Sequence, residues 1–436
     1  MRALYPTGDA ALGAAERFLA DRSLGLESPD ILRISGQVRA LKAEGAEVFD
    51  LTLGDFDPEH FPPPASLLAA IRRHLEAGRT NYPPADGVPA LRSAVADYYE
   101  RQLGVRFPVE SVLVGSGARP LLYSVYASTL TPGDALIYAA PSWNNEHYAY
   151  LNGVESIVLQ CGRETGFMPT LAQIEPHLER ARVLHINNPL NPTGTVMSSA
   201  ELTAISGAVV EENARRDARG RKALVMVYDM VYWPLVYGET EFRHPVQLVP
   251  EVAPHVVSID AISKWMASTG IRVGWAIVPP FAHAKIKALG SHAGAWAPHA
   301  EQHAVAEVLS GDSGFGDYVS DLKAGLEERL DVVSAALDEL ARNRTGVEAI
   351  RPQGAIYLSI RLDLVGGKTP QGKILEDSEQ VREYLLHEGR VGLIPFSAFG
   401  STDRDGWYRV SVAAMSTDRL REAMVALASA VEAVAG

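Results

Sequence analysis

Short apolar runs alternate with longer amphipathic stretches through the middle of this chain. The runs are bounded by Gly, Pro or Asp and show no regular polar alternation, which is typical of strands buried on both faces of a parallel sheet. The predicted strands cover residues 111–115, 135–139, 155–160, 183–187, 224–229, 255–260 and 274–278. Only residues 261–273 join the last two, which is short for a right-handed crossover and allows one of them to run antiparallel. The pattern predicts an α/β fold with helices on both faces of a mostly parallel sheet.

The pattern changes after about residue 300. Helical periodicity is followed by shorter alternating strands and a final amphipathic helix, which Ser416 can cap. The elements expected there are helices over 300–309 and 318–341, strands over 354–362 and 408–413, and the last helix. A helix predicted over 31–44 is expected to join them. We therefore expect a large domain over residues 55–305 and a small domain formed by residues 1–54 and 306–436.

Composition narrows the class of protein. The chain has 436 residues, of which 47% are hydrophobic, and this length suits two hydrophobic cores better than one. The net charge of −13 argues against non-specific binding to nucleic acid or an anionic membrane. No apolar run reaches the roughly 18 residues that predict a membrane span, and the N-terminus lacks a signal-peptide pattern. With Cys161 as the one cysteine, no internal disulfide forms, and a cytoplasmic location is expected.

Chemically useful side chains follow several predicted strands. Ligands of such sheets bind beyond the carboxyl ends of the strands. Lys264, beside Ser263, can form a Schiff base with an aldehyde cofactor, and Arg272 can hold a phosphate. Asp229 ends one strand, and Asn191 follows another in the sequence Asn-Pro-Thr-Gly.

A helix start after the first predicted strand offers a second group for a phosphate. Ser116, Gly117 and Ala118 precede Pro120, which suits a first helical turn. The free amide groups and the dipole of a helix N-terminus bind anions. We therefore expect a phosphate near Gly117 and Ala118.

These motifs, in this order, resemble those of the class I and II aminotransferases of the aspartate aminotransferase fold family, which use pyridoxal 5′-phosphate (PLP). The resemblance covers about residues 30–415. It implies fold type I, with a mostly parallel seven-stranded sheet sandwiched by helices in a large PLP-binding domain and a smaller α+β domain. It also implies a ping-pong reaction that moves an amino group between an L-amino acid and a 2-oxo acid.

The resemblance assigns the reacting groups. Lys264 is expected to form the Schiff base and to move the proton. Asp229 is expected to pair with the pyridine nitrogen of PLP, which makes the ring an electron sink. Tyr232 and Asn191 are expected to contact its phenolic oxygen. These assignments make Lys264, Asp229 and Tyr232 the catalytic residues, and no residue is assigned to a metal.

The remaining cofactor contacts lie around the phosphate. The amide groups of Gly117 and Ala118, the hydroxyl of Ser263 and the guanidinium of Arg272 are expected to hold it. Arg119 lies beside this loop and is also expected near the cofactor. A hydroxyl residue often found three places before the lysine in this family is Ala261 here, which weakens the expected grip on the phosphate unless Ser263 compensates.

The resemblance also implies substrate contacts and a partner subunit. Trp143 is expected to stack on the cofactor ring, Arg409 to bind the substrate α-carboxylate in a bidentate fork, and Gly54 to close over the substrate. Asn191 lies beside them. Tyr82 matches a tyrosine that reaches across a dimer interface to the phosphate, so the expected active unit is a homodimer with shared sites.

Two questions stay open from the sequence. Arg119 is a candidate cation for an acidic substrate side chain, whereas Trp143, Trp296 and Phe396 indicate room for an apolar or aromatic one. The donor, the acceptor and the pathway are not determined, and glutamate with 2-oxoglutarate is a default by resemblance only. A PLP-dependent β-lyase or β-decarboxylase shares the same residues. A non-catalytic PLP-binding sensor is disfavoured by the acidic charge and the complete set of catalytic residues.

Overall fold

The computed structural model describes residues 9–311, 314–402 and 406–435. The first residues of the chain, where no signal peptide is expected, lie outside this part. No helix in the described part combines the length and apolarity that crossing a bilayer requires.

Seven strands form the central sheet, in the order β2-β8-β7-β6-β5-β3-β4. Strand β8 runs antiparallel to both neighbours, and the other strands run in one direction. Since the connection from β7 to β8 is too short for a crossover over the sheet, β8 returns alongside β7. All seven predicted strands are confirmed, within a residue at their ends: β2 (Val112–Gly115), β3 (Ala135–Ala140), β4 (Glu155–Gln160), β5 (Val183–Asn187), β6 (Val225–Asp229), β7 (Val256–Ala261) and β8 (Gly274–Ile277).

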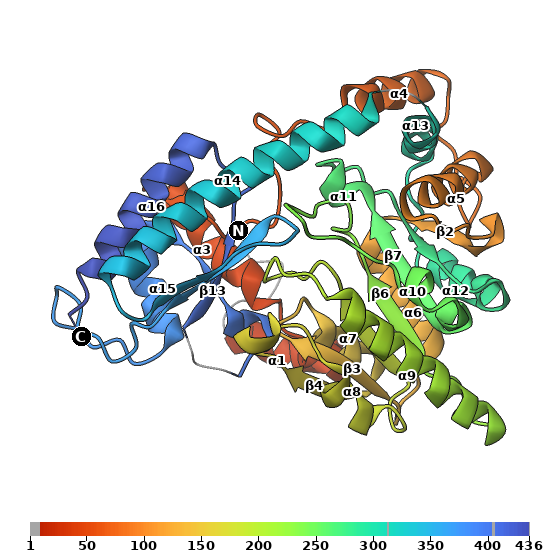
Figure 1. Ribbon diagram of the computed structural model, residues 1–436, viewed down its shortest axis with the longest axis horizontal. Helices are drawn as coiled ribbons and strands as arrows, with labels where there is room; N and C mark the ends of the chain where they lie inside the picture. The colour runs from red at the N-terminus through yellow and green to blue at the C-terminus, as the bar shows by residue number, and fades with distance from the viewer. Residues whose placement is uncertain (1–8, 312–313, 403–405, 436) are drawn as a thin grey trace.

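Helices cover both faces of this sheet (Figure 1). Alternate residues of a strand point to opposite faces: Leu113 packs in the cluster with α6 and α12, whereas Val112 and Val114 pack in the cluster with α5 and α13. Burial on both faces explains the unbroken apolar runs. The helices around the sheet are α4 (Ala65–Glu76), α5 (Pro89–Leu103), α6 (Ala118–Thr129), α7 (Asn145–Asn152), α8 (Leu171–Ile174), α9 (Ser199–Ala218), α10 (Pro245–Leu248), α11 (Ile262–Trp265), α12 (Pro280–His292) and α13 (His299–Ser310).

A smaller sheet forms from the C-terminal part of the chain. Its order is β12-β13-β10-β9, and every pairing is antiparallel. A separate parallel pair, β1 with β11, ties the N-terminal segment to this part. The long helix α14 runs from the α13 side of the molecule to α16 (Figure 1). The elements are α3 (Asp30–Ala43), β1 (Phe49–Asp50), α14 (Phe315–Asn343), β9 (Val347–Ile350), β10 (Tyr357–Leu362), α15 (Ser378–His387), β11 (Val391–Gly392), β12 (Ile394–Pro395), β13 (Trp407–Ser411) and α16 (Thr417–Glu432).

The predicted C-terminal helix and its cap are confirmed: the Ser416 side chain accepts a hydrogen bond from the backbone of Arg419. The helices expected over 31–44, 300–309 and 318–341 and the strands expected over 354–362 and 408–413 are present with shifted ends, whereas β9, β11 and β12 were not predicted. The domain boundaries at residues 55 and 305 stay a prediction.

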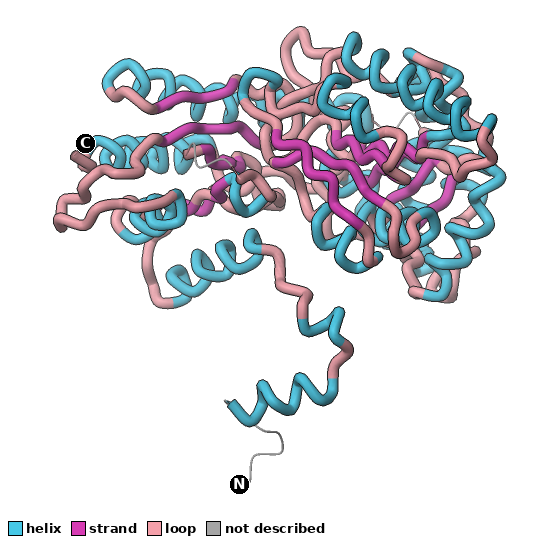
Figure 2. The backbone as a smooth tube through the Cα atoms, turned by 90° about the horizontal axis from the view of Figure 1, so that it is seen from below, coloured by secondary structure: helices cyan, strands magenta, loops and turns pink. Residues whose placement is uncertain are grey.

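Two short N-terminal helices, α1 (Asp9–Phe18) and α2 (Asp21–Leu24), stand away from the body of the molecule (Figure 2). They expose large apolar side chains, among them Leu12 and Phe18, the latter 88% exposed. These helices therefore contribute nothing to the core of the chain.

Candidate active site

A cavity of about 440 Å³ lies beyond the carboxyl ends of the parallel strands and reaches to the small sheet. Eleven of the predicted site residues line it: Gly54, Ala118, Arg119, Trp143, Asn191, Asp229, Tyr232, Ser263, Lys264, Arg272 and Arg409. Gly117 adjoins the cavity through Arg272, whereas Tyr82 lies elsewhere. The strand order brings these side chains together because β5, β6 and β7 are neighbours that end at the same edge.

Lys264 lies in the helical turn α11, directly after β7. Its amine donates a hydrogen bond of 2.6 Å to the backbone carbonyl of Gly54 and lies 5.7 Å from the centre of the Tyr232 ring. The loop that follows holds two non-glycine residues with positive φ, Ala267 at 45° and Arg272 at 64°. Such strained backbone is kept only where surrounding contacts fix it, and it concentrates at functional sites.

Asp229 ends β6 with its side chain partly buried at the cavity. Burial raises the pKa of Asp229 to about 7, while the backbone N–H of Val231 and the positive charge of Lys264 oppose the increase. The Val231 N–H donates to the carboxylate over 3.3 Å. In the described part of the chain, no cationic side chain forms an ion pair with this carboxylate. Asp229 therefore presents to the cavity a carboxyl group that has no ion-pair partner among the described residues.

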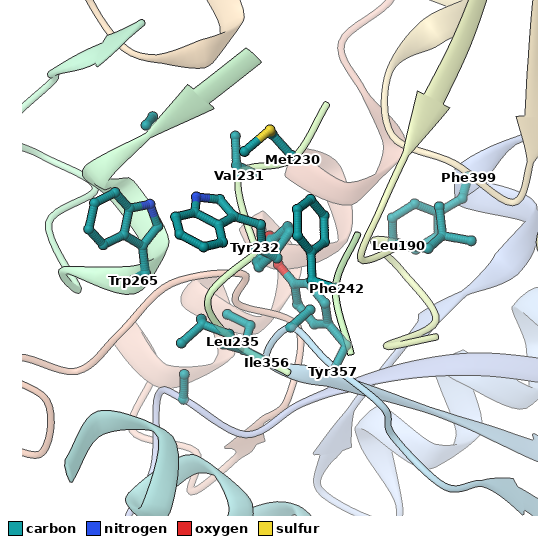
Figure 3. Close-up of a cluster of buried hydrophobic side chains, with 14 of the residues drawn as sticks. Leu190, Met230, Val231, Tyr232, Leu235, Phe242, Trp265, Ile356, Tyr357 and Phe399 are labelled. Carbon is teal, nitrogen blue, oxygen red and sulfur yellow. The ribbon is translucent and has the colours of Figure 1, made fainter. Parts of the chain in front are cut away.

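Tyr232 and Tyr357 meet at one wall of the cavity. Their hydroxyl groups lie 2.9 Å apart, and Figure 3 shows the two side chains converging. Tyr357 comes from β10 of the small sheet, and sequence reasoning missed it. It lies in a predicted strand, but no polar motif around it marked it as a site residue. The pair links the central sheet to the small sheet at the site.

Arg409 comes from β13 and is only 2% exposed. Its Nη1 donates to the side-chain oxygen of Asn191 over 3.0 Å, and its Nη2 donates to the carbonyl of Thr52 over 2.6 Å. Its buried Nε has no hydrogen-bond partner. Its guanidinium carbon lies 4.6 Å from the Tyr357 ring centre and 5.0 Å from that of Phe399. Burial lowers the pKa of Arg409, and no described carboxylate pairs with it, so it is a cation prepared for an anionic ligand.

The opposite end of the cavity forms an anion cradle. Gly117 adopts a φ of 82° as the N-cap of α6. A Cβ at Gly117 would lie 2.3 Å from Nη2 of Arg272, so only glycine leaves room. Arg272 donates to the carbonyls of Thr269 over 2.8 Å and Ser116 over 2.9 Å. Burial and the positive charge of the nearby Arg119 lower the pKa of Arg272, so two guanidinium groups gather at this end of the cavity.

Arg119 and Trp143 pack on one another at the cavity wall. The guanidinium carbon lies 4.7 Å from the Trp143 ring centre, a cation–π contact that fixes both side chains. Helix α3 closes the cavity opposite them with Ile31, Leu32, Ser35 and Arg39, none of which was predicted as a site residue.

Three aromatic residues lie away from the cavity. Phe396 is buried against Phe167 and Trp407, and Trp296 packs edge-on against Tyr82 at 5.1 Å. The hypothesis that Phe396 and Trp296 line a side-chain pocket with Trp143 is therefore wrong for this chain, since of the three only Trp143 lines it. Tyr82 is 80% exposed and makes no contact with the predicted site residues of its own chain.

Comparison with known proteins decides the family. The family model of aminotransferase class I and II matches residues 46–427. The chain belongs to the class I and II aminotransferases. Transaminase activity follows from this membership, and the family depends on PLP.

Relatives of this aminotransferase cover nearly its whole length. An aspartate/prephenate aminotransferase of Cereibacter sphaeroides is 30% identical over 409 residues, which are 93% of this chain and 96% of the relative. An aspartate aminotransferase of Streptomyces avermitilis is 30% identical over 408 residues, 93% of this chain and 94% of the relative. The crystal structure of the Rhizobium meliloti aspartate aminotransferase matches with a TM-score of 0.87 at 26% identity, covering 96% of this chain and 99% of that one. A Thermus thermophilus aspartate aminotransferase with maleate matches with a TM-score of 0.83 at 26% identity, covering 94% and 99%. Fold type I is thus confirmed.

The residues present fit PLP on three independent grounds. The cradle at Gly117 and Arg272 suits a phosphate. The uncompensated carboxylate of Asp229 suits a protonated ring nitrogen. The amine of Lys264 is free of any carboxylate partner among the described residues. In that part of the chain, no group of three or more His, Cys, Asp or Glu side chains is placed to hold a metal ion.

Proposed function

We propose that this aminotransferase binds PLP in the cavity between the two sheets and moves an amino group between an L-amino acid and a 2-oxo acid in a ping-pong cycle. PLP supplies an aldehyde carbon and an electron-withdrawing ring. Every other step falls to residues of the chain.

The proposed cofactor contacts form two groups, one around the phosphate of PLP and one around its pyridine ring. Gly117 and Ala118 present backbone N–H groups at the start of α6, and Arg272 adds its charge for the phosphate. Ser263 lines the same end. At the ring, Asp229 keeps the pyridine nitrogen protonated, because an ion pair with a partly buried carboxylate favours the charged forms of both groups.

The proposed ring contacts continue at one face of the ring and at its phenolic oxygen. Trp143, held by Arg119, offers a flat surface for stacking. Tyr232 donates its hydroxyl to the phenolic oxygen of PLP. Asn191 already accepts from Arg409 through its side-chain oxygen, so its amide nitrogen is left to donate to the same oxygen.

Arg409 is proposed to bind the substrate α-carboxylate. Burial makes an ion pair there stronger than one at the surface, and the guanidinium fork fixes the orientation of Cα. Gly54 contributes its backbone beside the substrate. Its carbonyl accepts from Lys264, which aims the amine into the cavity. Lys264 would hold PLP at rest, and its amine, once the amino group of the substrate had taken its place, would be positioned to accept and to return the Cα proton.

The observation that carries this proposal is the set of groups in one cavity: an amine, a carboxylate without a cation, and guanidinium groups without carboxylates. Mixing the purified protein with PLP and adding the twenty amino acids one at a time, while the visible spectrum is recorded, tests it. A change from the spectrum of bound PLP to that of pyridoxamine phosphate, with release of the 2-oxo acid, is expected. Release of pyruvate with no need for an oxo-acid acceptor would identify a β-lyase instead. Bound PLP that no amino acid changes would support a sensor.

The same titration addresses the substrate. We propose an acidic side chain, because Arg119 lies at the cavity wall and because relatives carry the name aspartate aminotransferase. Arg39 adds a second cation at the mouth. Aspartate or glutamate should then react fastest. Phenylalanine or leucine reacting fastest would favour the apolar wall formed by Trp143.

We also propose a homodimer with shared sites. The ring of Tyr82 is 80% exposed, and apolar side chains of α1 and α2, among them Leu12, Phe18 and Leu24, are exposed as well. A second copy would cover both features. A cytoplasmic location stays a prediction.

A further inference from the structure

A buried carboxylate lies behind the reactive lysine, outside the cavity. Asp260 in β7 is 1% exposed. Its Oδ2 accepts hydrogen bonds from the hydroxyl of Tyr99 and the indole nitrogen of Trp233, both at 2.8 Å. Its Oδ1 accepts from the backbone of Ala261 at 2.7 Å and from the indole nitrogen of Trp265 at 3.2 Å. No described cation pairs with it, so these donors alone compensate its charge.

Two of the donors to Asp260 are sequence neighbours of proposed catalytic residues. Trp265 directly follows Lys264, and Trp233 directly follows Tyr232. One carboxylate therefore anchors the neighbours of two proposed catalytic residues that come from different strands. The two indole rings also contact one another, with centres 6.3 Å apart. Figure 3 shows Trp265 and Tyr232 in the same buried cluster.

Two more aromatic contacts surround this cluster, and neither reaches Asp260 directly. The indole nitrogen of Trp275 in β8 donates to the hydroxyl of Tyr99 over 2.7 Å. Tyr98 stacks on Trp265 with ring planes 2° apart and centres 5.6 Å apart. Three of the four donors to Asp260 are aromatic side chains, whereas packing alone would be served equally well by an apolar residue at position 260.

We propose that Asp260 is a positioning residue: through Trp265 and Trp233 it fixes where Lys264 and Tyr232 stand relative to each other. This inference rests on the proposed roles of those two residues. An asparagine cannot replace it, because an amide has one acceptor oxygen and so leaves buried donors unpaired. The carboxylate is the side chain of this length that accepts from every donor present.

Matched Trp→Phe substitutions test the proposal. Trp265→Phe and Trp233→Phe each remove one donor to Asp260, whereas Trp275→Phe removes an equally buried donor that binds Tyr99 instead. In the PLP-free proteins, the rate at which an amine-selective reagent labels Lys264 is measured by peptide mass spectrometry. In the PLP-loaded proteins, kcat and KM are measured with the fastest amino acid.

We expect Trp265→Phe to speed Lys264 labelling by more than about threefold, since the lysine segment opens more often. We expect kcat to fall roughly 10- to 100-fold with little change in KM, since small displacements of a reacting group cost this much. Trp233→Phe should lower kcat without changing Lys264 labelling. Trp275→Phe should leave labelling and kcat within about twofold, even where Tm falls equally.

Equal effects of Trp265→Phe and Trp275→Phe would overturn the proposal, because they would show general loosening of the core. As a second test, adding Trp265→Phe to Asp260→Asn should slow turnover no further than Asp260→Asn alone, and a full multiplicative loss would also overturn it. Failure of the wild-type protein to hold PLP at Lys264 would defeat the proposed function instead. The labelling comparison in PLP-free protein would still decide whether Asp260 positions Lys264.

Discussion

The amine of Lys264 donates a 2.6 Å hydrogen bond to the carbonyl of Gly54, a residue 210 positions earlier in the chain. This contact joins the end of the central sheet to the segment that follows β1. Among the described residues no carboxylate forms an ion pair with this amine, so it can exchange the neutral carbonyl for a ligand. The proposed reactive atom therefore lies where the two sheets meet.

Replacing Lys264 with alanine should abolish turnover. The residue is proposed both to hold PLP and to move the proton, and loss of such a group costs on the order of a thousandfold or more. Non-covalent PLP binding should survive, because the phosphate cradle and Asp229 are unchanged. Equilibrium dialysis with PLP and a stopped-flow half-reaction measure both effects. Lys285→Ala, at an exposed lysine on α12, serves as the control, and normal turnover in Lys264→Ala would contradict the mechanism.

Replacing Gly117 with alanine should weaken PLP binding roughly 10- to 100-fold. The new Cβ would meet the Arg272 guanidinium at 2.3 Å, and φ is 82°, so both the cradle and the backbone would have to shift. Gly207→Ala is the matched control. That glycine lies within α9 with nothing within 4 Å of a new Cβ, so alanine should stabilise the protein by about 0.5–1 kcal/mol. Unchanged PLP affinity in Gly117→Ala would show that the phosphate does not bind beside Gly117 and Arg272.

Replacing Asp229 with asparagine should change how the stability of the PLP-free protein depends on pH. The folded-state pKa of about 7 lies above the ordinary value of 3.8. Folded Asp229 therefore keeps its proton over a range where the unfolded residue has lost it, and this contribution to stability disappears as pH rises through about 7. Asparagine does not titrate, so the variant does not lose this stability as pH rises. The variant should gain on the order of 1–3 kcal/mol relative to wild type between about pH 4 and pH 8.

Urea unfolding of both PLP-free proteins at the two pH values measures this difference. Because Asp260 titrates in the same range, the comparison must be between variant and wild type, in which that contribution cancels. A difference in unfolding free energy that does not change with pH would show that Asp229 is not held protonated. With PLP, the variant should lose activity despite its added stability.

Replacing Arg409 with lysine should raise KM for every amino acid substrate and lower kcat/KM by about 100-fold. An ammonium group cannot form the fork, and it cannot keep the contacts to Asn191 and Thr52 together with a substrate carboxylate. Steady-state kinetics with amino acids of different side chains measure the effect. Arg106→Lys, at an exposed arginine, is the control. A loss confined to acidic amino acids would assign Arg409 to the side chain and not to the α-carboxylate.

Mixing two inactive variants tests the shared site. A mixed dimer has one Tyr82→Ala subunit and one Lys264→Ala subunit. If Tyr82 acts across the interface, the Tyr82→Ala subunit keeps its own Lys264 and receives an intact Tyr82 from its partner, so one of the two sites is complete. Activity should therefore appear when the two proteins are unfolded and refolded together, but not when each is refolded alone. A mixture with no more activity than its components, at a molecular mass showing dimers, would place Tyr82 outside the partner's site.

The sequence predicted the central sheet well because most of its strands are buried on both faces, the edge strand β4 being the exception. Unbroken apolar runs such as that of β3 are recognisable in the sequence alone. Strand β8 runs antiparallel to β7, as the short connection between these two strands suggested. The small sheet was predicted less completely. Its strand β12 pairs over two residues and β9 is only partly buried, so neither has a periodicity long enough to detect.

Some residues of the candidate site were also predictable from local sequence, whereas others were not. Lys264, Asp229 and Arg272 follow strands in short motifs, and the structure brings them together. Tyr357, Thr52 and Asp260 reach the site or its support through contacts between distant segments, which no local pattern contains. The prediction that Phe396 lines a side-chain pocket was wrong because a sequence motif does not show the direction of a side chain. The ring of Phe396 turns into the core and packs against Trp407.

Borohydride reduction of the PLP-loaded protein tests whether Lys264 holds the cofactor. Reduction fixes PLP to the lysine that holds it, and peptide mass spectrometry identifies that lysine. We expect a single PLP adduct on Lys264, which is absent when the fastest amino acid is added before the reductant. An adduct on another lysine, or none on a protein that still moves amino groups, would contradict it.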